Sequence, residues 1–354
     1  MHKFSFGLFG LLFLGNVAQA TNLRGGAELL NPQAYSVHFN TSMFNTTGYY
    51  TTEAVEQNIG SANKYRLIDV DLGISYGFGK NFEVSGFGRF RSVSSTIGDV
   101  TSENSGLESL GIEAKYGFER VGNIRYAIGA HYRQTLYSNA SFDITKASPT
   151  DEIVLGDAGS EYGIDLYMTY LSTIKWDAKI GYNSPANELS GEIPYMIEAA
   201  YRFTSLSVLG GVEGIYSIKN DAFSDAPSTK PAQNTGVTGL FNSINREKIA
   251  PYLGLNYAFN KAVFSLKGQT IISGTSTDKG NTISAGLTWN SDGITPESVK
   301  IDSFKEYHID GSVLKVSARG NFLRIDQGLS TDVEKGMKFD IYQTDYFGGN
   351  TLVG

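Results

Sequence analysis

Apolar and polar positions alternate with a period of two along most of the chain, from about residue 34 to residue 291. The clearest segment is 67–79, in which every second residue from Ile68 to Phe78 is apolar. The residues between them are aspartate, glycine or serine, beginning with Asp69 and Asp71. Because side chains of a β-strand point alternately to its two faces, this pattern predicts strands with one apolar and one polar face.

The alternating segments are long enough to cross a membrane. A soluble β-sandwich alternates too, but its strands are usually about 5–6 residues long, whereas a bilayer requires about 9–11. The sequence therefore predicts an all-β fold, a transmembrane antiparallel up-and-down β-barrel of about 12 strands within residues 21–291. The predicted strands are 34–49, 65–79, 81–95, 107–121, 124–138, 161–173, 175–184, 192–204, 206–220, 247–260, 262–275 and 280–291.

Short and long connections also alternate. The short turns are predicted at 79–81, 121–123, 172–174, 204–206 and 260–261. The other connections are mostly longer and polar, at 50–64, 96–106, 139–160, 185–191, 221–246 and 276–279. Outer-membrane barrels have short turns on the periplasmic side and long loops outside, so we expect that orientation here.

Aromatic residues gather on the apolar face close to the predicted short turns, while aliphatic residues occupy the middle of the strands. Such a distribution is typical of an aromatic girdle at one membrane interface. The predicted periplasmic girdle comprises Tyr76, Phe78, Phe82, Tyr116, Phe118, Tyr170, Trp176, Tyr201, Phe203, Tyr257, Phe259, Phe264 and Trp289.

With these features the chain resembles Gram-negative, porin-like outer-membrane β-barrel proteins over residues 34–291. The stretch 284–289, Ser-Ala-Gly-Leu-Thr-Trp, is similar to the terminal-strand assembly signal of such barrels, although it lies inside the chain. The resemblance implies an outer-membrane location, contact with membrane lipid and lipopolysaccharide, and insertion by the barrel-assembly machinery.

The first twenty residues are predicted to be a signal peptide. Lys3 supplies a positive charge, residues 4–14 are mainly apolar, and Ala18-Gln19-Ala20 forms a small-residue cleavage site. The apolar stretch is too short to span a bilayer, so we expect export and cleavage after Ala20.

Composition narrows the classes further. The 354 residues include 41 Gly, 21 Tyr and 21 Phe but no Cys, and the formal net charge is −7. The lack of a long apolar run after the N-terminus excludes a helical membrane protein. The lack of cysteine excludes disulfides and thiolate metal sites, and the negative charge argues against nucleic acid as a partner.

If the apolar face contacts lipid, the polar face lines the bore. The residues predicted to line it are Asp69, Asp71, Glu83, Arg89, Arg91, Glu113, Lys115, Glu119, Arg125, His131, Arg133, Asp165, Asp177, Lys179, Glu198, Arg202, Glu213, Lys219 and Lys267. Acidic and basic groups balance, which argues against strong ion selectivity.

Two functions remain open at this stage. The protein is a channel for passive diffusion of small polar solutes or ions, or it is a non-conducting structural or surface-interaction barrel tethered to the periplasm by its C-terminal module. Twelve strands lie between the filled eight-stranded and the open sixteen-stranded barrels, so size does not decide. Acids and bases that pair across the bore would favour the closed barrel.

No catalytic, metal or cofactor site is predicted. The outer-membrane phospholipases place His and Ser two residues apart on one strand, and neither His38 nor His131 matches that motif. The acidic residues of the third and fifth loops, among them Asp157, Glu161 and Asp221, are expected to be solvated, with a Ca²⁺ site as the alternative.

The pattern changes after residue 291. Residues 292–305 are predicted to be a linker, and 306–354 a small partial β module with a hairpin from 311–316 and 322–328 and a third strand over 333–342. The order G-x-V, G-N-F-x-R-I-D-Q-G, V-x-K-G-M-x-F-x-I-Y is similar to SH3-like modules of bacterial envelope proteins, such as the C-terminal module of a flagellar assembly protein. This resemblance implies a periplasmic module with peptidoglycan or a periplasmic protein as partner.

Overall fold

The computed structural model describes residues 26–140, 142–143, 145–146, 151–203 and 205–292, and shorter stretches at 311–317, 322–328, 333, 339–344 and 350–352. The chain divides into two compact units, residues 1–293 and 294–354. The predicted signal peptide and nearly all of the predicted linker lie outside the described residues.

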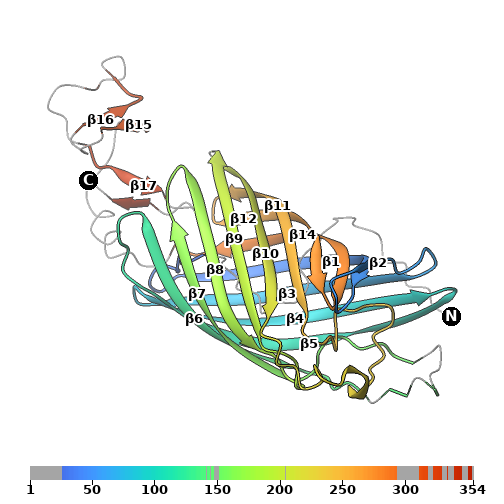
Figure 1. Ribbon diagram of the computed structural model, residues 1–354. Helices are drawn as coiled ribbons and strands as arrows, with labels where there is room; N and C mark the ends of the chain where they lie inside the picture. Colours follow the sequence, from blue (N-terminus) through green and yellow to red (C-terminus); the bar gives the residue numbers. More distant parts are fainter. Residues whose placement is uncertain are drawn as a thin grey trace, which may run out of the picture. The chain divides into compact units, whose positions relative to one another are not determined.

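The first unit is built from twelve long strands joined in chain order (Figure 1). Two short strands, β2 (Glu56–Gln57) and β13 (Ser273–Thr275), extend it at one rim. The twelve are β1 (Tyr35–Tyr50), β3 (Lys64–Phe78), β4 (Phe82–Ile97), β5 (Val100–Gly117), β6 (Ile124–Thr135), β7 (Ser160–Tyr170), β8 (Ile174–Ser184), β9 (Glu192–Phe203), β10 (Leu206–Ser217), β11 (Glu247–Phe259), β12 (Ala262–Thr270) and β14 (Thr277–Asn290).

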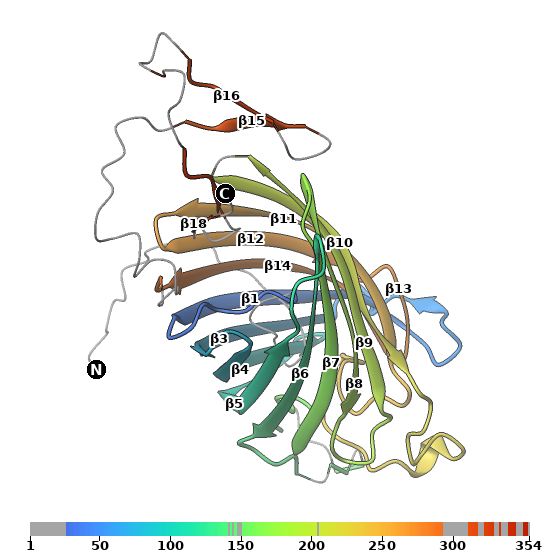
Figure 2. The same cartoon turned by 90° about the vertical axis from the view of Figure 1, so that its left-hand side faces the viewer.

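The sheet closes on itself, because the first strand pairs with the last. Strand β1 pairs antiparallel with β14, with Ser36 opposite Asn290 and Phe39 opposite Leu287, and with β3 on its other side. All other neighbours are consecutive and antiparallel, and Figure 2 shows the strands running side by side around the wall. The predicted twelve-stranded antiparallel barrel is confirmed.

The two faces of the barrel wall are inverted relative to a soluble protein. On β3 the outward Leu72 and Ile74 are 58% and 56% exposed, whereas the inward Asp69 and Asp71 are 0% and 3% exposed. Apolar side chains on the outside and polar side chains inside suit a wall that contacts lipid. No helix among the described residues is long and apolar enough to cross a membrane.

Two of the predicted long connections are wrong. Residues 96–106 belong to a hairpin in which β4 and β5 run on to a turn at 98–99, with Gly98 at φ 60°. Residues 277–279 begin β14. Apart from Ile97 and Val100 beside the turn, residues 96–106 are polar or glycine, so alternation could not reveal these strands. The hydroxyls of Thr96 and Thr101 bond across the pair at 3.0 Å.

The predicted aromatic girdle lies on the outer surface beside the short turns. Within it, ring pairs such as Tyr76–Phe78 and Tyr201–Phe203 meet edge to face, with centroids 4.6 and 4.8 Å apart. Trp289 packs on Tyr35 across the β1–β14 seam at 5.3 Å. These rings form a band that surrounds the short-turn end.

The described residues of the second unit form two separate two-stranded sheets. Strand β15 (Val313–Val316) pairs with β16 (Leu323–Ile325), in agreement with the predicted hairpin, and β17 (Tyr342–Thr344) pairs with β18 (Asn350–Leu352). The strand predicted over 333–342 falls largely outside the described residues. These two small sheets do not support an SH3-like module.

The girdle can be tested through the only two tryptophans of the chain, Trp176 and Trp289. Both are outward-facing, 43% and 37% exposed, and lie near short turns. We expect lipids brominated near the headgroup to quench both strongly, and lipids brominated at the chain end to quench them less. The variants Trp176→Phe and Trp289→Phe report each site alone, and quenching by aqueous iodide only would contradict a lipid-facing girdle.

Candidate functional site

The inner wall of the barrel carries ion pairs between side chains that face each other on neighbouring strands. Arg91 on β4 lies opposite Asp69 on β3 and donates two bonds to its carboxylate, at 2.6 and 2.9 Å. Arg89 lies opposite Asp71 and donates from Nε at 2.7 Å. All four side chains are at least nine-tenths buried. Such buried charges are tolerated because each has a partner at hydrogen-bond distance.

A β-bulge adds a carboxylate to this group. The pairing of β4 with β5 shifts between Arg89 and Phe90, so that both Glu108 and Ser109 turn inward. Glu108 lies 3.1 Å from Arg133 Nη1 and 3.8 Å from Arg91 Nη1, and Arg133 also meets Glu161 at 2.8 Å. Sequence alternation missed Glu108, because a bulge breaks the period of two.

A second group lies nearer the short-turn end, on β5 to β8. Asp165 approaches His131 Nδ1 at 3.3 Å and Lys179 at 3.8 Å. The Tyr167 hydroxyl lies 3.0 Å from both Asp165 and Glu113. Lys115 Nζ lies 4.3 Å from the centre of the Tyr167 ring. Acids, bases and one tyrosine thus form a continuous polar network along the wall.

Inward glycines allow side chains of strands two apart to touch. Tyr252 on β11 reaches Glu198 on β9 at 3.0 Å across Gly211 of β10, whose missing Cβ would lie 2.6 Å from the Tyr252 oxygen. Gly129 on β6 is placed in the same way between Glu113 and Tyr167. These glycines are required for close approach of neighbours.

The sixteen charged or histidine residues predicted to line the bore, and Asp177, lie on the inward face and are buried or half-buried. Two further predictions were wrong. Lys219 follows the end of β10, with its side chain 59% exposed and paired with Glu247, and Glu119 lies in an exposed turn after β5. Both were extrapolated from alternation beyond the ends of their strands.

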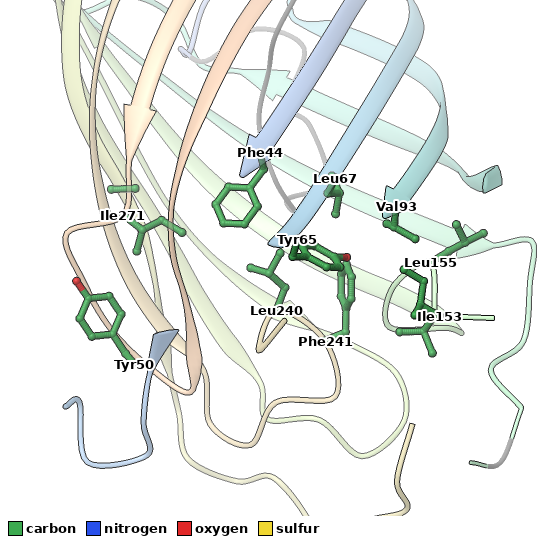
Figure 3. Packing of buried hydrophobic residues seen from close by; sticks show 12 residues of the cluster. Phe44, Tyr50, Tyr65, Leu67, Val93, Ile153, Leu155, Leu240, Phe241 and Ile271 are labelled. Atoms are coloured by element: carbon green, nitrogen blue, oxygen red, sulfur yellow. The ribbon is translucent and has the colours of Figure 1, made fainter. Parts of the chain in front are cut away.

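Two connections fold into the loop end of the bore. We call residues 151–158 and 231–246 the plug. From the plug, Ile153, Leu155, Leu240 and Phe241 pack against inward residues of the wall, and Figure 3 shows them beside Phe44, Tyr65, Leu67 and Val93. The wall is therefore polar in its middle and apolar near the loop end, where it receives the plug.

Polar contacts anchor the plug to the barrel. The carboxylate of Asp278, at the start of β14, accepts bonds from the Thr238 hydroxyl at 2.6 Å and the Gly239 N–H at 2.5 Å, and from Thr46 of the wall. Asp278 is 0% exposed. Because it bonds to both plug and wall, it is a direct link between them.

Within the plug, Arg246 bonds to Asp157 at 2.8 Å and to Glu192 of β9 at 2.5 Å. Burial alone would lower the pKa of Arg246, but these two carboxylates raise it above its usual value. The acidic loop residues were predicted to be solvated, and this is wrong for Asp157 and Glu161, which pair with buried arginines, and for Asp221, which pairs with Lys230 at 2.8 Å.

A cavity of about 30 Å³ remains between plug and wall. Its lining includes Arg133 and Asp165, whose Nε and Oδ1 atoms have no hydrogen-bond partner among the described residues. Its volume and polar lining suit a water molecule. Among those residues no group of three or more His, Asp or Glu is placed to hold a metal ion.

The same architecture occurs in a solved structure. An outer membrane channel from Pseudomonas putida F1 superposes with a TM-score of 0.56 at 12% identity, over 78% of this chain and 100% of that chain. The NanC porin (TM-score 0.40, 8% identity, 72% and 98% of the chains) and LpxR from Salmonella typhimurium (0.40, 10%, 72% and 99%) are more distant. No protein-family model and no curated protein matches the chain. The first comparison shows the fold, that of an outer-membrane β-barrel.

The glycine gaps can be tested by adding one methyl group. Gly211→Ala places a Cβ against the Ile197 carbonyl and the Tyr252 hydroxyl, so we expect a loss of stability of about 1–3 kcal/mol from overpacking. Gly268→Ala on β12 is the matched control, since its Cβ would meet nothing within 4 Å. The measurement is the temperature at which the folded, fast-migrating band disappears in gel electrophoresis. Equal unfolding midpoints for Gly211→Ala and Gly268→Ala would contradict the close contact between Tyr252 and the Gly211 backbone.

Proposed function

We propose that the protein is an outer-membrane channel for small polar solutes or ions, and that the described conformation is its closed state. The observation that carries the proposal is the direction of the ion pairs. Ion pairs between wall residues join strands one or two places apart in the sheet, as Arg91 does with Asp69 and Lys267 with Glu213, so these pairs lie along the wall. What occupies the loop end of the bore is the plug, which is a pair of loops and can move without breaking the barrel.

The fold shared with a channel from Pseudomonas putida F1 is compatible with this proposal. The balanced charges of the wall favour passage of neutral or zwitterionic polar solutes over strong selection by sign. The outward apolar belt supports membrane lipid and lipopolysaccharide as its surroundings, and insertion by the barrel-assembly machinery remains part of the proposal. So does the absence of enzymatic activity.

The second candidate is a non-conducting structural or surface-interaction barrel. The apolar packing of the plug favours it, because burying Leu240 and Phe241 against the wall stabilises the closed conformation. In that case the second unit would hold peptidoglycan or a periplasmic protein and tie it to the membrane.

Planar-bilayer recordings of the purified protein separate the two candidates. We expect discrete conductance steps from the wild type. In a salt gradient, Arg133→Glu should shift the reversal potential toward the equilibrium potential of the cation, because the bore gains two negative charges. Arg120→Glu, at an exposed short turn, is the control and should leave the reversal potential unchanged. Persistent silence of a folded, heat-modifiable barrel would contradict the channel.

The plug contacts predict how the gate responds to Asp278. Asp278→Ala removes the bonds to Thr238 and Gly239, which we expect to weaken closure by about 2 kcal/mol and to raise the open probability roughly thirtyfold. Asp143→Ala, in an exposed loop, is a matched control. An open probability equal to that of the wild type would show that the plug is not the gate.

A further inference from the structure

A segment that precedes the first strand of the barrel also enters the bore. We call residues 26–34, directly before β1, the strap. Its side chains Ala27, Leu29, Leu30 and Ala34 are at most 9% exposed, although no strand or helix includes them. A short extended segment on the surface would leave such residues open to solvent, so their burial indicates that the barrel encloses them.

The strap bonds to the inner wall along its whole length. At its β1 end, Gln33 N–H bonds to the Gly77 carbonyl of β3 at 2.8 Å, and Leu30 N–H bonds to Glu83 of β4 at 2.7 Å. Farther on, Glu28 pairs with Lys175 of β8 at 2.6 Å. Each contact lies within a few residues of a short turn.

At its far end the strap is held from both sides. The Ala27 N–H bonds to the Thr169 hydroxyl of β7 at 2.8 Å, and Lys115 of β5 bonds to the Gly26 carbonyl at 3.0 Å. The contacts therefore run from β3 through β4 and β5 to β7 and β8.

These contacts take the strap from one side of the bore to the other. In the closed ring of twelve strands, β8 is six places from β1 and thus on the opposite side. Twelve strands about 4.8 Å apart and tilted by about 40° give a barrel about 24 Å wide. Nine extended residues reach at most about 30 Å, which is enough to cross it.

The wall is shaped to receive the strap. A Cβ on Gly77 would collide with the Asn31 carbonyl, and one on Gly117 would lie 2.7 Å from Leu29 Cδ1. A Cβ on Gly26 of the strap itself would lie 2.5 Å from the Thr169 hydroxyl. Glycines on both partners, a carboxylate for a backbone N–H and a lysine for Glu28 together make a built binding site.

We propose that the inner wall of β3 to β8 at the short-turn end is a peptide-binding site whose ligand is the chain's own segment 26–34, and that the bound segment closes this mouth of the bore. The closing role rests on the proposed channel function, whereas the binding site does not. The strap is held by hydrogen bonds and one ion pair that water can replace, and only a few small or medium apolar side chains are buried, so release leaves the barrel intact. Closure at this mouth is independent of the plug at the other.

The experiment uses the full chain with residues 26–32 deleted, which keeps the Gln33 bond to β3. The probe is a synthetic peptide of residues 26–34, labelled for fluorescence anisotropy and also added to bilayer recordings. We expect the peptide to bind the deletion variant and not the wild type, whose site is filled. A Glu28→Gln peptide should bind about tenfold more weakly, since it loses the Lys175 pair, and a scrambled peptide should not bind.

In recordings, the deletion variant should open more often than the wild type, and the peptide should return it to the wild-type level from the short-turn side only. No peptide binding to a folded deletion variant would overturn the inference. Equal conductance of both proteins would overturn the closing role while leaving the channel intact. If the peptide binds the deletion variant but neither protein conducts in the bilayer, the peptide site is supported and the proposed channel function is overturned.

Discussion

A charge can be buried in a barrel only where an opposite charge or hydrogen-bond donors meet it, and the rest of this structure depends on that constraint. Arg89 and Arg91 lie directly opposite Asp71 and Asp69 on the neighbouring strand. A slip of one residue in the pairing of β3 with β4 would turn either the two aspartates or the two arginines toward lipid and the apolar residues of that strand toward the bore. The ion pairs on the inner face and the apolar belt on the outer face therefore favour the same strand register. This register fixes the wall against which the plug and strap lie.

The bore is filled in three ways that have different physical origins. In the middle, wall side chains pair along the sheet, with room created by glycines such as Gly129 and Gly211. At the loop end, apolar residues of two connections pack on apolar wall residues. At the short-turn end, a backbone segment takes hydrogen bonds from the wall. Only the first is part of the sheet itself, so the other two can change without unfolding the barrel.

The sequence predicts a strand well where lipid contacts one face and the polar interior contacts the other, because the two environments select different residues at alternate positions. Segment 67–79 was predicted with both of its faces, because lipid selects apolar residues at every second position. The hairpin at 96–106 was missed because water contacts both of its faces. Glu108 was missed because a bulge breaks the period, and Leu240 and Phe241 because no periodicity marks a loop that folds inward. The strap was missed for the same reason: its nine residues carry no repeat, and only the glycines opposite them hint at its place.

The seam between β1 and β14 has a consequence for the order of assembly. Every other pair in the wall joins strands that are neighbours in the chain, but His38 bonds to Thr288 across 250 residues. The entropy lost in closing so long a loop is offset only by the β1–β14 pairing, which requires the last strand. We therefore expect β1 to complete its pairing later than the other strands. The strap directly precedes that strand, but its contacts with the inner wall lie on β3 to β8, none of which belongs to the β1–β14 seam. Its site therefore does not depend on when the seam closes, and the strap can enter or leave a finished ring through the short-turn mouth.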